Sequence, residues 1–322
     1  MTDFLLLEQI HKLISDLKKP RLMFRKGICA KGYFKPYLPL SEYTDAELFG
    51  EELREFPVTV RFSSMLGDAG TADTRRNLRG MSVRFYDTSG ASQSRSKIYD
   101  MICSNFPAFF IHDLKQFPQL HCAMTVQESF DRIDPERFWE FVTEHREALL
   151  CTLYLYSGMG LGGSYLNQIW HEVNPCIWTK NGAETAIVRC QWHPLTHQEK
   201  PISKEYAEFL YGFDPHRAGK ELQRSIMEGH FPAFELSVQM MEPDQFHGNP
   251  DCRRRTVPWN ETEYPSMAVG MMKLVELEDE TEWDSEKAAT PGNTMEGISL
   301  YCDEFAGMMD YLHRRSAAER GK

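Results

Sequence analysis

Residues 61–86, RFSSMLGDAGTADTRRNLRGMSVRFY, constrain the fold of this chain more than any other segment. Two runs rich in β-branched and aromatic residues, 57–63 and 81–87, flank a turn. The turn is polar and contains Asp68, Gly70, Asp73 and several arginines. Such residues are typical of a connection between strands. The segment therefore predicts a strand-rich core.

The rest of the chain mixes strands with helices. Strand-like segments follow at 176–178, 186–192, 234–241 and 267–277. Helical stretches begin at Asp134-Pro135-Glu136 and span 203–212, 216–228 and 303–319, whereas the acidic, Gly- and Pro-containing segment 278–297 is expected to be an exposed crossing loop. Many closely spaced strands with helices inserted late predict an α+β fold, an antiparallel barrel with packed helices.

Composition limits the class of protein. The 322 residues, 42% hydrophobic and 26% charged, suit a soluble globular chain, and no apolar run is long enough to span a bilayer. Residues 1–20 have apolar positions at helical spacing and no cleavage site, so we expect an amphipathic helix and a cytoplasmic protein. The net charge of −11 argues against a nucleic-acid partner. Eight cysteines without a C-x-x-C pair indicate free thiols.

A set of ordered motifs identifies a family. VRFS, ADT and RG are followed by N-x-P-x-FFI-x-D within residues 60–113, and this order resembles the haem-binding core of catalases. The resemblance implies one catalase-like domain over residues 1–322, with haem b (iron protoporphyrin IX) between the barrel and its helices. Its parts would be an N-terminal helix (1–20), a barrel core (about 21–280) and a haem-ligand helix (about 300–319). The short chain looks like the small catalase-related subgroup.

The iron ligand is expected on the last helix. Without the resemblance, a tyrosine on an apolar helix face would be a packing residue. The segment P-x-N-x-M-x-G-I resembles the family's approach to its tyrosine ligand, and this resemblance assigns the iron to Tyr311. The family's arginine four residues earlier is replaced by Gly307, for which Arg314 or Arg315 is the candidate substitute. Cys302 is a competing ligand, but no positive charge beside it lowers its pKa.

The remaining haem contacts follow from the same resemblance. Arg21 and Arg61 match the family's propionate-binding arginines, and guanidinium groups bind carboxylates through paired hydrogen bonds. Arg61 lies inside a strand-like run, where an unpaired charge would be costly. Phe117 in KQFP matches the ring that stacks on the porphyrin.

The side that receives peroxide departs from the family. The family pattern R-x-x-H-A-K-G is RLMFRKG here, so Phe24 replaces the histidine base, while Ser63 and Asn105 match its serine and asparagine neighbours. Heterolysis of hydrogen peroxide needs a proton carrier, which typically contributes about 10²–10⁴-fold. Neither Phe24 nor a neutral amide can carry that proton, so we expect little catalase activity.

These residues predict a haem enzyme that acts on a small-molecule peroxide or metabolite. An organic hydroperoxide cleaved homolytically needs no proton shuttle, as in the allene oxide synthase and hydroperoxide lyase branch that the chain resembles. Asn105 would orient the peroxide and Phe24 would exclude water. The alternatives are a low-activity catalase or peroxidase and a non-enzymatic haem sensor. We also expect a homo-oligomer, such as a homodimer.

Overall fold

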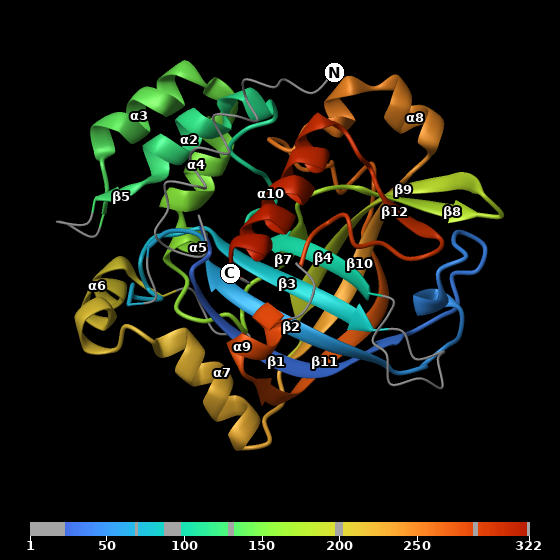
Figure 1. Ribbon diagram of the computed structural model, residues 1–322, viewed down its shortest axis with the longest axis horizontal. Helices are drawn as coiled ribbons and strands as arrows, with labels where there is room; N and C mark the ends of the chain where they lie inside the picture. The colour runs from blue at the N-terminus through green and yellow to red at the C-terminus, as the bar shows by residue number, and fades with distance from the viewer. Residues whose placement is uncertain are drawn as a thin grey trace.

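The computed structural model describes residues 23–67, 70–86, 98–127, 132–196, 202–285 and 289–320. The predicted helix 1–20 and Arg21 lie outside these ranges. Figure 1 shows a β-barrel at the centre with helices packed around it. Within the described ranges, no helix is long and apolar enough to cross a membrane.

The barrel consists of eight antiparallel strands within the described part of the chain. Their order is β10-β11-β1-β2-β3-β4-β7-β9, and pairing of β9 with β10 closes the circle. The strands are β1 (Lys26–Pro36), β2 (Phe56–Ser64), β3 (Arg79–Tyr86), β4 (Ile98–Ser104), β7 (Trp170–Glu172), β9 (Ala183–Pro194), β10 (Ala233–Met241) and β11 (Met267–Glu278). The predicted antiparallel barrel is confirmed.

Shorter strands lie outside this circle. β8 (Cys176–Lys180) pairs with β9, and β12 (Ile298–Leu300) pairs with β8. β5 (Val126–Gln127) and β6 (Arg132–Ile133) form a separate pair. Figure 1 shows β8 and β9 projecting together beyond the barrel.

The helices lie around the barrel in groups. In Figure 1, α2, α3 and α4 lie together, α6 and α7 lie beside each other, and α10 crosses the barrel. The α-helices are α2 (Phe117–Met124), α3 (Pro135–Glu144), α4 (Leu149–Tyr156), α5 (Gly158–Leu161), α6 (Lys204–Phe213), α7 (Arg217–Met227), α8 (Pro243–Gly248), α9 (Glu280–Ser285) and α10 (Glu304–Arg320). Short 3₁₀ helices span Glu47–Phe49, Leu114–Gln116, Arg146–Ala148 and Pro250–Arg253. Asp134 begins α3 as predicted, because its carboxylate accepts a hydrogen bond from the Glu136 amide.

The segment 278–297 differs from the prediction. It was expected to be an exposed loop, but it contains α9 and buries Trp283 and Thr290 against the barrel. The prediction was wrong because acidic composition says little about a segment whose charges pair with the barrel. Glu280, for instance, forms an ion pair with Arg61 of β2.

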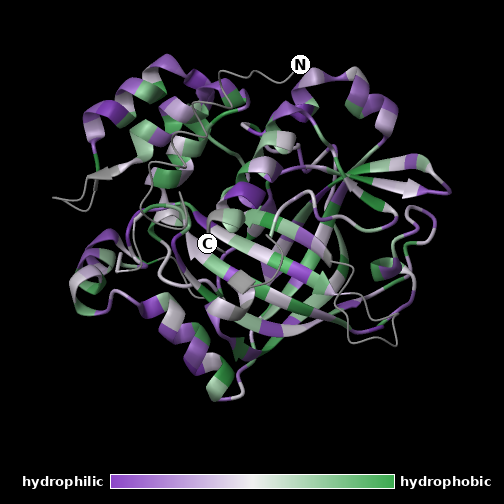
Figure 2. Cartoon of the chain, in the orientation of Figure 1, coloured by the Kyte–Doolittle hydropathy of each residue, from purple (hydrophilic) through white to green (hydrophobic). Residues whose placement is uncertain are grey.

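Side chains alternate between the inside and the outside of the barrel along each strand, and this separates the apolar core inside the barrel from a second apolar core outside it. On β2, Val58, Val60 and Phe62 point into the barrel, where they pack with residues of the other strands such as Phe234 and Trp192. Strand side chains alternate between the two faces, so the intervening residues point outward. Figure 2 shows this alternation of polar and apolar bands along the barrel strands. A second apolar cluster joins α2, α3, α4 and α10 outside the barrel.

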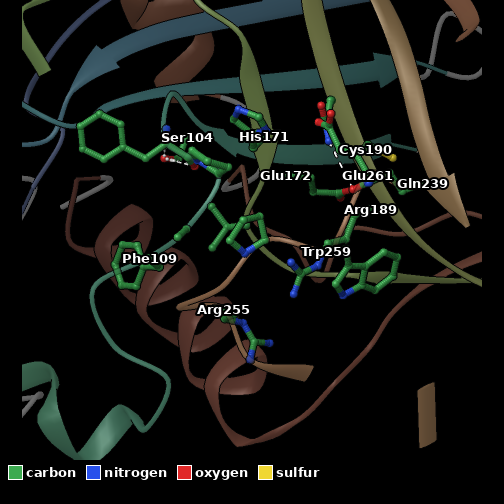
Figure 3. Close-up of a pocket in the computed structure, with 16 residues that line it drawn as sticks. Ser104, Phe109, His171, Glu172, Arg189, Cys190, Gln239, Arg255, Trp259 and Glu261 are labelled. Atoms are coloured by element: carbon green, nitrogen blue, oxygen red, sulfur yellow. Dashed lines mark hydrogen bonds between the residues drawn. The ribbon is translucent and has the colours of Figure 1, made fainter. Parts of the chain in front are cut away.

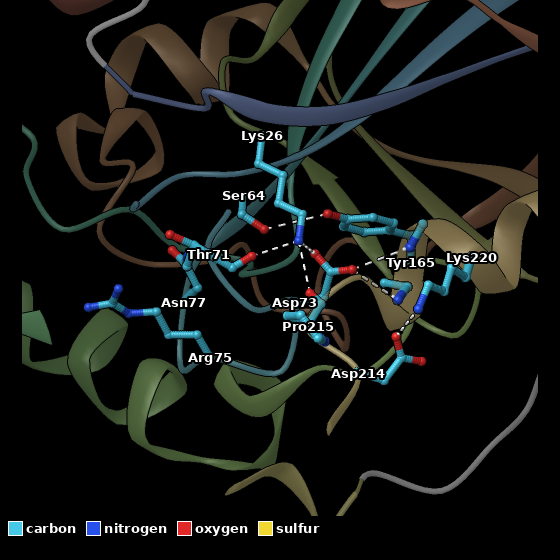
Figure 4. A network of polar contacts seen from close by, with 12 residues as sticks. Lys26, Ser64, Thr71, Asp73, Arg75, Asn77, Tyr165, Asp214, Pro215 and Lys220 are labelled. Atoms are coloured by element: carbon cyan, nitrogen blue, oxygen red, sulfur yellow. Dashed lines mark hydrogen bonds and ion pairs between the residues drawn. The ribbon is translucent and has the colours of Figure 1, made fainter. Parts of the chain in front are cut away.

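The polar turn after β2 is anchored by buried charges. The Lys26 ammonium lies 2.7 Å from the Asp73 carboxylate and donates to the carbonyls of Thr71 and Pro215 (Figure 4). Asp73 also accepts the backbone amide of Ala218 in the first turn of α7, where a helix favours negative charge. The contacts link β1, the turn and α7, and so fix the start of β1 beside the candidate site.

Candidate functional site

Three neighbouring strands present two rows of outward-facing residues, and one of these rows has only small side chains. Ser63 of β2 lies opposite Gly80 of β3, which lies opposite Ser104 of β4. Arg61, Ser82 and Ile102 form the next row in the same register. We call these six residues the floor. Because Ser63, Gly80 and Ser104 have small side chains, their row leaves space beneath the helices that cover the floor.

A cavity of about 180 Å³ fills this space. All six floor residues line it, and the opposite walls come from the segment before β1, from α2, from α9 and from α10. The other lining residues are mainly apolar: Met23, Phe24, Met65, Leu78, Cys103, Phe109, Phe117, Val173, Trp283, Ala289, Met309, Leu312, His313 and Ser316. We call this the large cavity.

Phe24 lies in the large cavity, as the sequence predicted for the residue at that position. Its backbone has φ of 57°, a left-handed conformation that bulky residues rarely adopt. Two hydrogen bonds hold it there: its amide donates to the Met65 carbonyl, and its carbonyl accepts from the Arg61 guanidinium. A conformation of this kind persists only where its surroundings determine it. The aromatic ring is therefore held at a fixed place in the cavity wall.

Arg61 lines the large cavity but is paired within the chain. Its Nε and Nη2 donate to one carboxylate oxygen of Glu280 at 2.8 and 2.5 Å. Gly27 makes room for this side chain, since a Cβ there would lie 2.4 Å from Nη2. The predicted propionate-binding group thus already has a carboxylate partner. Arg21, its predicted companion, lies outside the described residues.

The last helix places a different residue in the cavity than the sequence predicted. Met309, Leu312, His313 and Ser316 of α10 line it, with the i, i+3, i+4, i+7 spacing of one helix face. Tyr311 does not line it and is 38% exposed. His313 lines the cavity whereas Tyr311 does not, because two residues along a helix turn the side chain by roughly 200°. The helical spacing in the sequence could have pointed to His313.

His313 is oriented by a backbone carbonyl. Its Nδ1 lies 2.8 Å from the carbonyl oxygen of Ala289, which also lines the cavity. The other candidates for the iron side are elsewhere: Cys302 is an exposed thiol, and Arg314 pairs with Asp310 on the helix surface.

Asn105 likewise does not line the large cavity. Its amide is fully buried, accepts from the Arg79 backbone N–H at 2.8 Å and donates to the Met159 carbonyl at 3.1 Å. Ser104, one residue earlier, is on the floor. Asn105 was expected to orient peroxide, but the residue that lines the large cavity is its neighbour Ser104, since successive residues of an extended chain point to opposite sides. Ser63 and Phe117 both line the cavity, as expected.

A smaller cavity of about 50 Å³, lined by both charged and apolar residues, adjoins the large cavity at Ser104 (Figure 3). It shares Ser104, Phe109 and Val173 with the large cavity and contains His171 and Glu172 of β7. Burial raises the pKa of Glu172 to about 7 and lowers the pKa of His171 to about 3. Both side chains are therefore uncharged over part of the acidic range.

Glu172 also lies beside two buried cysteines. One oxygen of its carboxylate and the thiols of Cys176 and Cys190 lie within 4.8 Å of one another. The hydrogen bond with Cys176, followed by burial, raises the pKa of the Cys190 thiol. The same hydrogen bond lowers the pKa of the Cys176 thiol, but burial and the nearby Glu172 carboxylate raise it overall. The sequence spacing gave no sign of this cluster, because its members come from three strands.

Comparison with known proteins places the chain in a family. A family model described as Catalase matches residues 1–308. A catalase of Methanosarcina barkeri (strain Fusaro / DSM 804) is 30% identical over 309 residues, which are 94% of this chain and 59% of that protein. Catalase-2 of Bacillus subtilis (strain 168) is 29% identical and is covered over 44% of its length. The chain belongs to the catalase family, and it spans less than two thirds of the length of these relatives.

A solved structure gives the same fold. The crystal structure of a fungal catalase superposes with a TM-score of 0.85 over 99% of this chain and 63% of that one, at 24% sequence identity. The family match ends at residue 308, before the part of α10 that carries His313. The family match therefore does not include His313, and the position of its side chain is given by the structure alone.

Catalases typically bind haem, and the residues of the large cavity fit such a group. In the floor, the row of Ser63, Gly80 and Ser104 has only small side chains of its own, and the ring of Phe24 lies beside Gly80. Phe117 supplies an aromatic wall, and His313 supplies an imidazole, a common ligand of haem iron. The side chains that line the cavity therefore suit haem.

Proposed function

We propose that this chain is a haem-dependent enzyme of the catalase family that converts an organic hydroperoxide, or oxidises a small metabolite with a peroxide- or oxygen-derived oxidant. We propose further that it decomposes hydrogen peroxide poorly. Haem, when bound, supplies an iron centre that reacts with the O–O bond of a peroxide. The floor and Phe117 would hold its plane, and Arg61 would meet its carboxylates.

The observation that carries this proposal is the ring of Phe24 in the cavity wall. Hydrogen peroxide decomposition needs a side chain that moves a proton between the two oxygens. Phe24 has no proton to exchange, and its backbone hydrogen bonds to Met65 and Arg61 hold it in place. The cavity is also lined by the imidazole of His313, which belongs to α10 and not to the segment of Phe24.

The chemistry of the walls supports an organic substrate. Met65, Leu78 and Phe24 present apolar surface, which would bury the hydrocarbon part of a hydroperoxide and exclude water. The hydroxyl groups of the floor are Ser63, Ser82 and Ser104. Ser63 and Ser104 donate to the carbonyls of Gly80 and Phe106, so each would have to exchange that hydrogen bond to donate to a peroxide. Hydrogen peroxide has no apolar part to bury, so the apolar walls would favour an organic hydroperoxide over it.

The test compares peroxides on one haem-loaded preparation. Turnover is measured with hydrogen peroxide, cumene hydroperoxide and a fatty-acid hydroperoxide, for the wild type and for Phe24→His. We expect the organic hydroperoxides to be consumed faster by the wild type. The histidine variant should gain at least about tenfold in oxygen evolution from hydrogen peroxide. Robust oxygen evolution by the wild type would contradict the proposal.

A further inference from the structure

One carboxyl group lies on the inner face of the barrel. Glu172 of β7 is two residues from the fully buried Trp170, so both side chains are on the same face of the strand. Glu172 also pairs with Cys103 of β4, a residue of the core inside the barrel. Its Oε2 is buried and has no hydrogen-bond partner among the described residues. An apolar core disfavours an isolated carboxyl group, so the neighbours of this group should explain why it lies there.

Two thiols lie beside this carboxyl group. The pairing of His171 with Gln191 places Glu172 next to Cys190 of β9, and Cys176 of β8 belongs to the same core. A carboxylate oxygen of Glu172 and the sulfurs of Cys176 and Cys190 lie within 4.8 Å of one another. The ligands of a tetrahedral zinc ion, with bonds of about 2.0–2.3 Å, are roughly 3.5–4 Å apart. Small movements of the side chains would therefore bring these three atoms to the separation that zinc requires.

The hydrogen bonds within this cluster leave two buried polar atoms unsatisfied. The Cys190 thiol hydrogen-bonds with Glu172 and with Cys176, yet Glu172 Oε2 and the Tyr99 hydroxyl have no partner in the described part of the chain. Tyr99 is 4% exposed. Burial, followed by the charges of Glu172, Cys176 and Cys190, raises the pKa of its hydroxyl, which therefore lies close to the cluster. A bound cation accounts for both atoms, because it can use the free carboxylate oxygen and creates thiolates that accept a hydrogen bond from Tyr99.

We propose that Glu172, Cys176 and Cys190 bind a zinc ion inside the barrel, and that Tyr99 is a positioning residue that donates a hydrogen bond to these ligands. Two thiolates and a carboxylate suit a tetrahedral zinc site and leave a fourth position for water. The smaller cavity is lined by Glu172 and Cys190, and its volume of about 50 Å³ is large enough for a water molecule. Sulfur ligands favour zinc over magnesium and calcium, which prefer oxygen.

The ion would join two strands at a break in the sheet. β7 and β8 pair with β9 one after the other, whereas β10 pairs with its opposite edge. Glu172 is the last residue of β7 and Cys176 the first of β8, so a shared ion would connect the two strand ends through Cys190 of β9. In the metal-free protein burial raises the pKa of Glu172 to about 7, so binding at neutral pH and below displaces protons from the cluster.

The decisive measurement requires no variant. X-ray absorption at the zinc edge is recorded on the wild type loaded with one equivalent of zinc chloride, and haem iron does not interfere because it absorbs at a different energy. We expect two sulfur neighbours at about 2.3 Å and two oxygen or nitrogen neighbours at about 2.0–2.2 Å. A shell of oxygen and nitrogen alone, as an adventitious surface ion would give, would overturn the proposal. A number of sulfur neighbours other than two would overturn this ligand set.

Variants then identify the ligands. Loss of a hydrogen-bond partner of a ligand typically costs 10–100-fold in metal affinity, so loss of a ligand itself should cost at least about 100-fold. We expect this loss in Cys176→Ala and Cys190→Ala, with affinity measured by competition against a chromophoric chelator. Cys151→Ala, at a buried thiol outside the barrel, and Cys302→Ala, at an exposed thiol, are the matched controls and should bind as the wild type does. Wild-type affinity in both Cys176→Ala and Cys190→Ala would refute the site.

Tyr99→Phe tests the positioning role. It should weaken zinc binding by roughly 10-fold while keeping both sulfur neighbours in the absorption spectrum, because the phenol touches the ligands and not the ion. Unchanged affinity in this variant would remove Tyr99 from the site.

Stability and haem provide the remaining controls. Zinc should raise the melting temperature of the wild type by a few degrees and leave that of Cys176→Ala unchanged, since only a site that binds the native state stabilises it. An equal rise in both would place the ion elsewhere. Haem-free and haem-loaded protein should bind zinc alike, because the three ligands face the inside of the barrel. The zinc site does not depend on the proposed function, and a failure to bind zinc would leave that function intact.

Discussion

The ring of Phe24 lies against the backbone of Gly80. A Cβ added to Gly80 would lie 3.0 Å from Cε1 of that ring and 3.2 Å from the Ser63 hydroxyl. Both distances are tighter than ordinary van der Waals contact. The missing side chain at position 80 thus sets how closely Phe24 can approach the floor, and the contact connects a residue before β1 to the start of β3.

This contact predicts the effect of Gly80→Ala. The added methyl group must displace the Phe24 ring, whose backbone is held by Met65 and Arg61. We expect the free energy of unfolding, measured with urea, to fall by about 1–3 kcal/mol. In the double variant with Phe24→Ala the methyl group no longer meets a ring. The two effects should then be non-additive by at least about 0.5 kcal/mol, and strict additivity would contradict the contact.

The fold could be predicted from the sequence because its signals are local. The β-type runs at 57–63 and 81–87 coincide with β2 and β3, and the motif order restricts how they connect. Which helix covers which strands is a tertiary property. The segment 278–297 shows this: its composition resembles a loop, but Glu280 reaches the barrel through an ion pair with Arg61.

The structure brings four of the residues expected at the site to one cavity. Phe24, Arg61, Ser63 and Phe117 all line the large cavity. Tyr311 and Asn105 do not line it, since a motif match fixes a neighbourhood whereas the side-chain direction changes with every residue. One step along an extended chain reverses the face, and two steps along a helix turn it by roughly 200°.

The hydrogen bonds that Asn105 makes inside the protein predict the effect of Asn105→Ala. The variant removes the acceptor of the buried Arg79 amide and the donor to the Met159 carbonyl. Leaving such groups unsatisfied costs about 1–3 kcal/mol each. We expect a clear loss in the free energy of unfolding, measured by chemical denaturation, with near wild-type turnover per haem-loaded molecule.

Ser104→Ala is the matched control on the adjacent residue. Ser104 lines both cavities, and its hydroxyl accepts from the Phe106 amide at 3.0 Å. Compared with Asn105→Ala, Ser104→Ala should lose less free energy of unfolding and should change peroxide turnover more. If Asn105→Ala is instead as stable as the wild type but inactive, its amide acts on the substrate after all.

Glu280 is expected to compete with the carboxylates of haem. It holds the Arg61 guanidinium through two hydrogen bonds to one oxygen, so an incoming carboxylate must displace it. Glu280→Gln removes the charge and should bind hemin roughly tenfold more tightly, the effect of about 1.4 kcal/mol. Fluorescence-quenching titration of the apoprotein measures this. Arg61→Gln is the matched control and should bind more weakly; weaker binding by Glu280→Gln would rule out the competition.

The stability of the protein should depend on pH through Glu172 and His171, with opposite signs. The pKa of Glu172 rises from 4.5 to about 7 on burial, so the native state retains a proton that the unfolded state loses, and stability falls as the pH rises from about 4.5 to about 7. The full effect is on the order of 3 kcal/mol. The pKa of His171 falls from 6.5 to about 3, so stability falls as the pH drops through that range.

The two effects oppose each other between about pH 4.5 and pH 6.5, so the wild type should show a shallow dependence there. Glu172→Gln removes one of them. Its free energy of unfolding, measured by urea denaturation across pH 4 to 8, should fall more steeply than that of the wild type as the pH drops below about 6.5, because only His171 then binds protons on unfolding. His171→Gln should show the reverse, a loss of stability as the pH rises toward about 7. Parallel curves for the wild type and Glu172→Gln would mean that the buried carboxyl ionises normally.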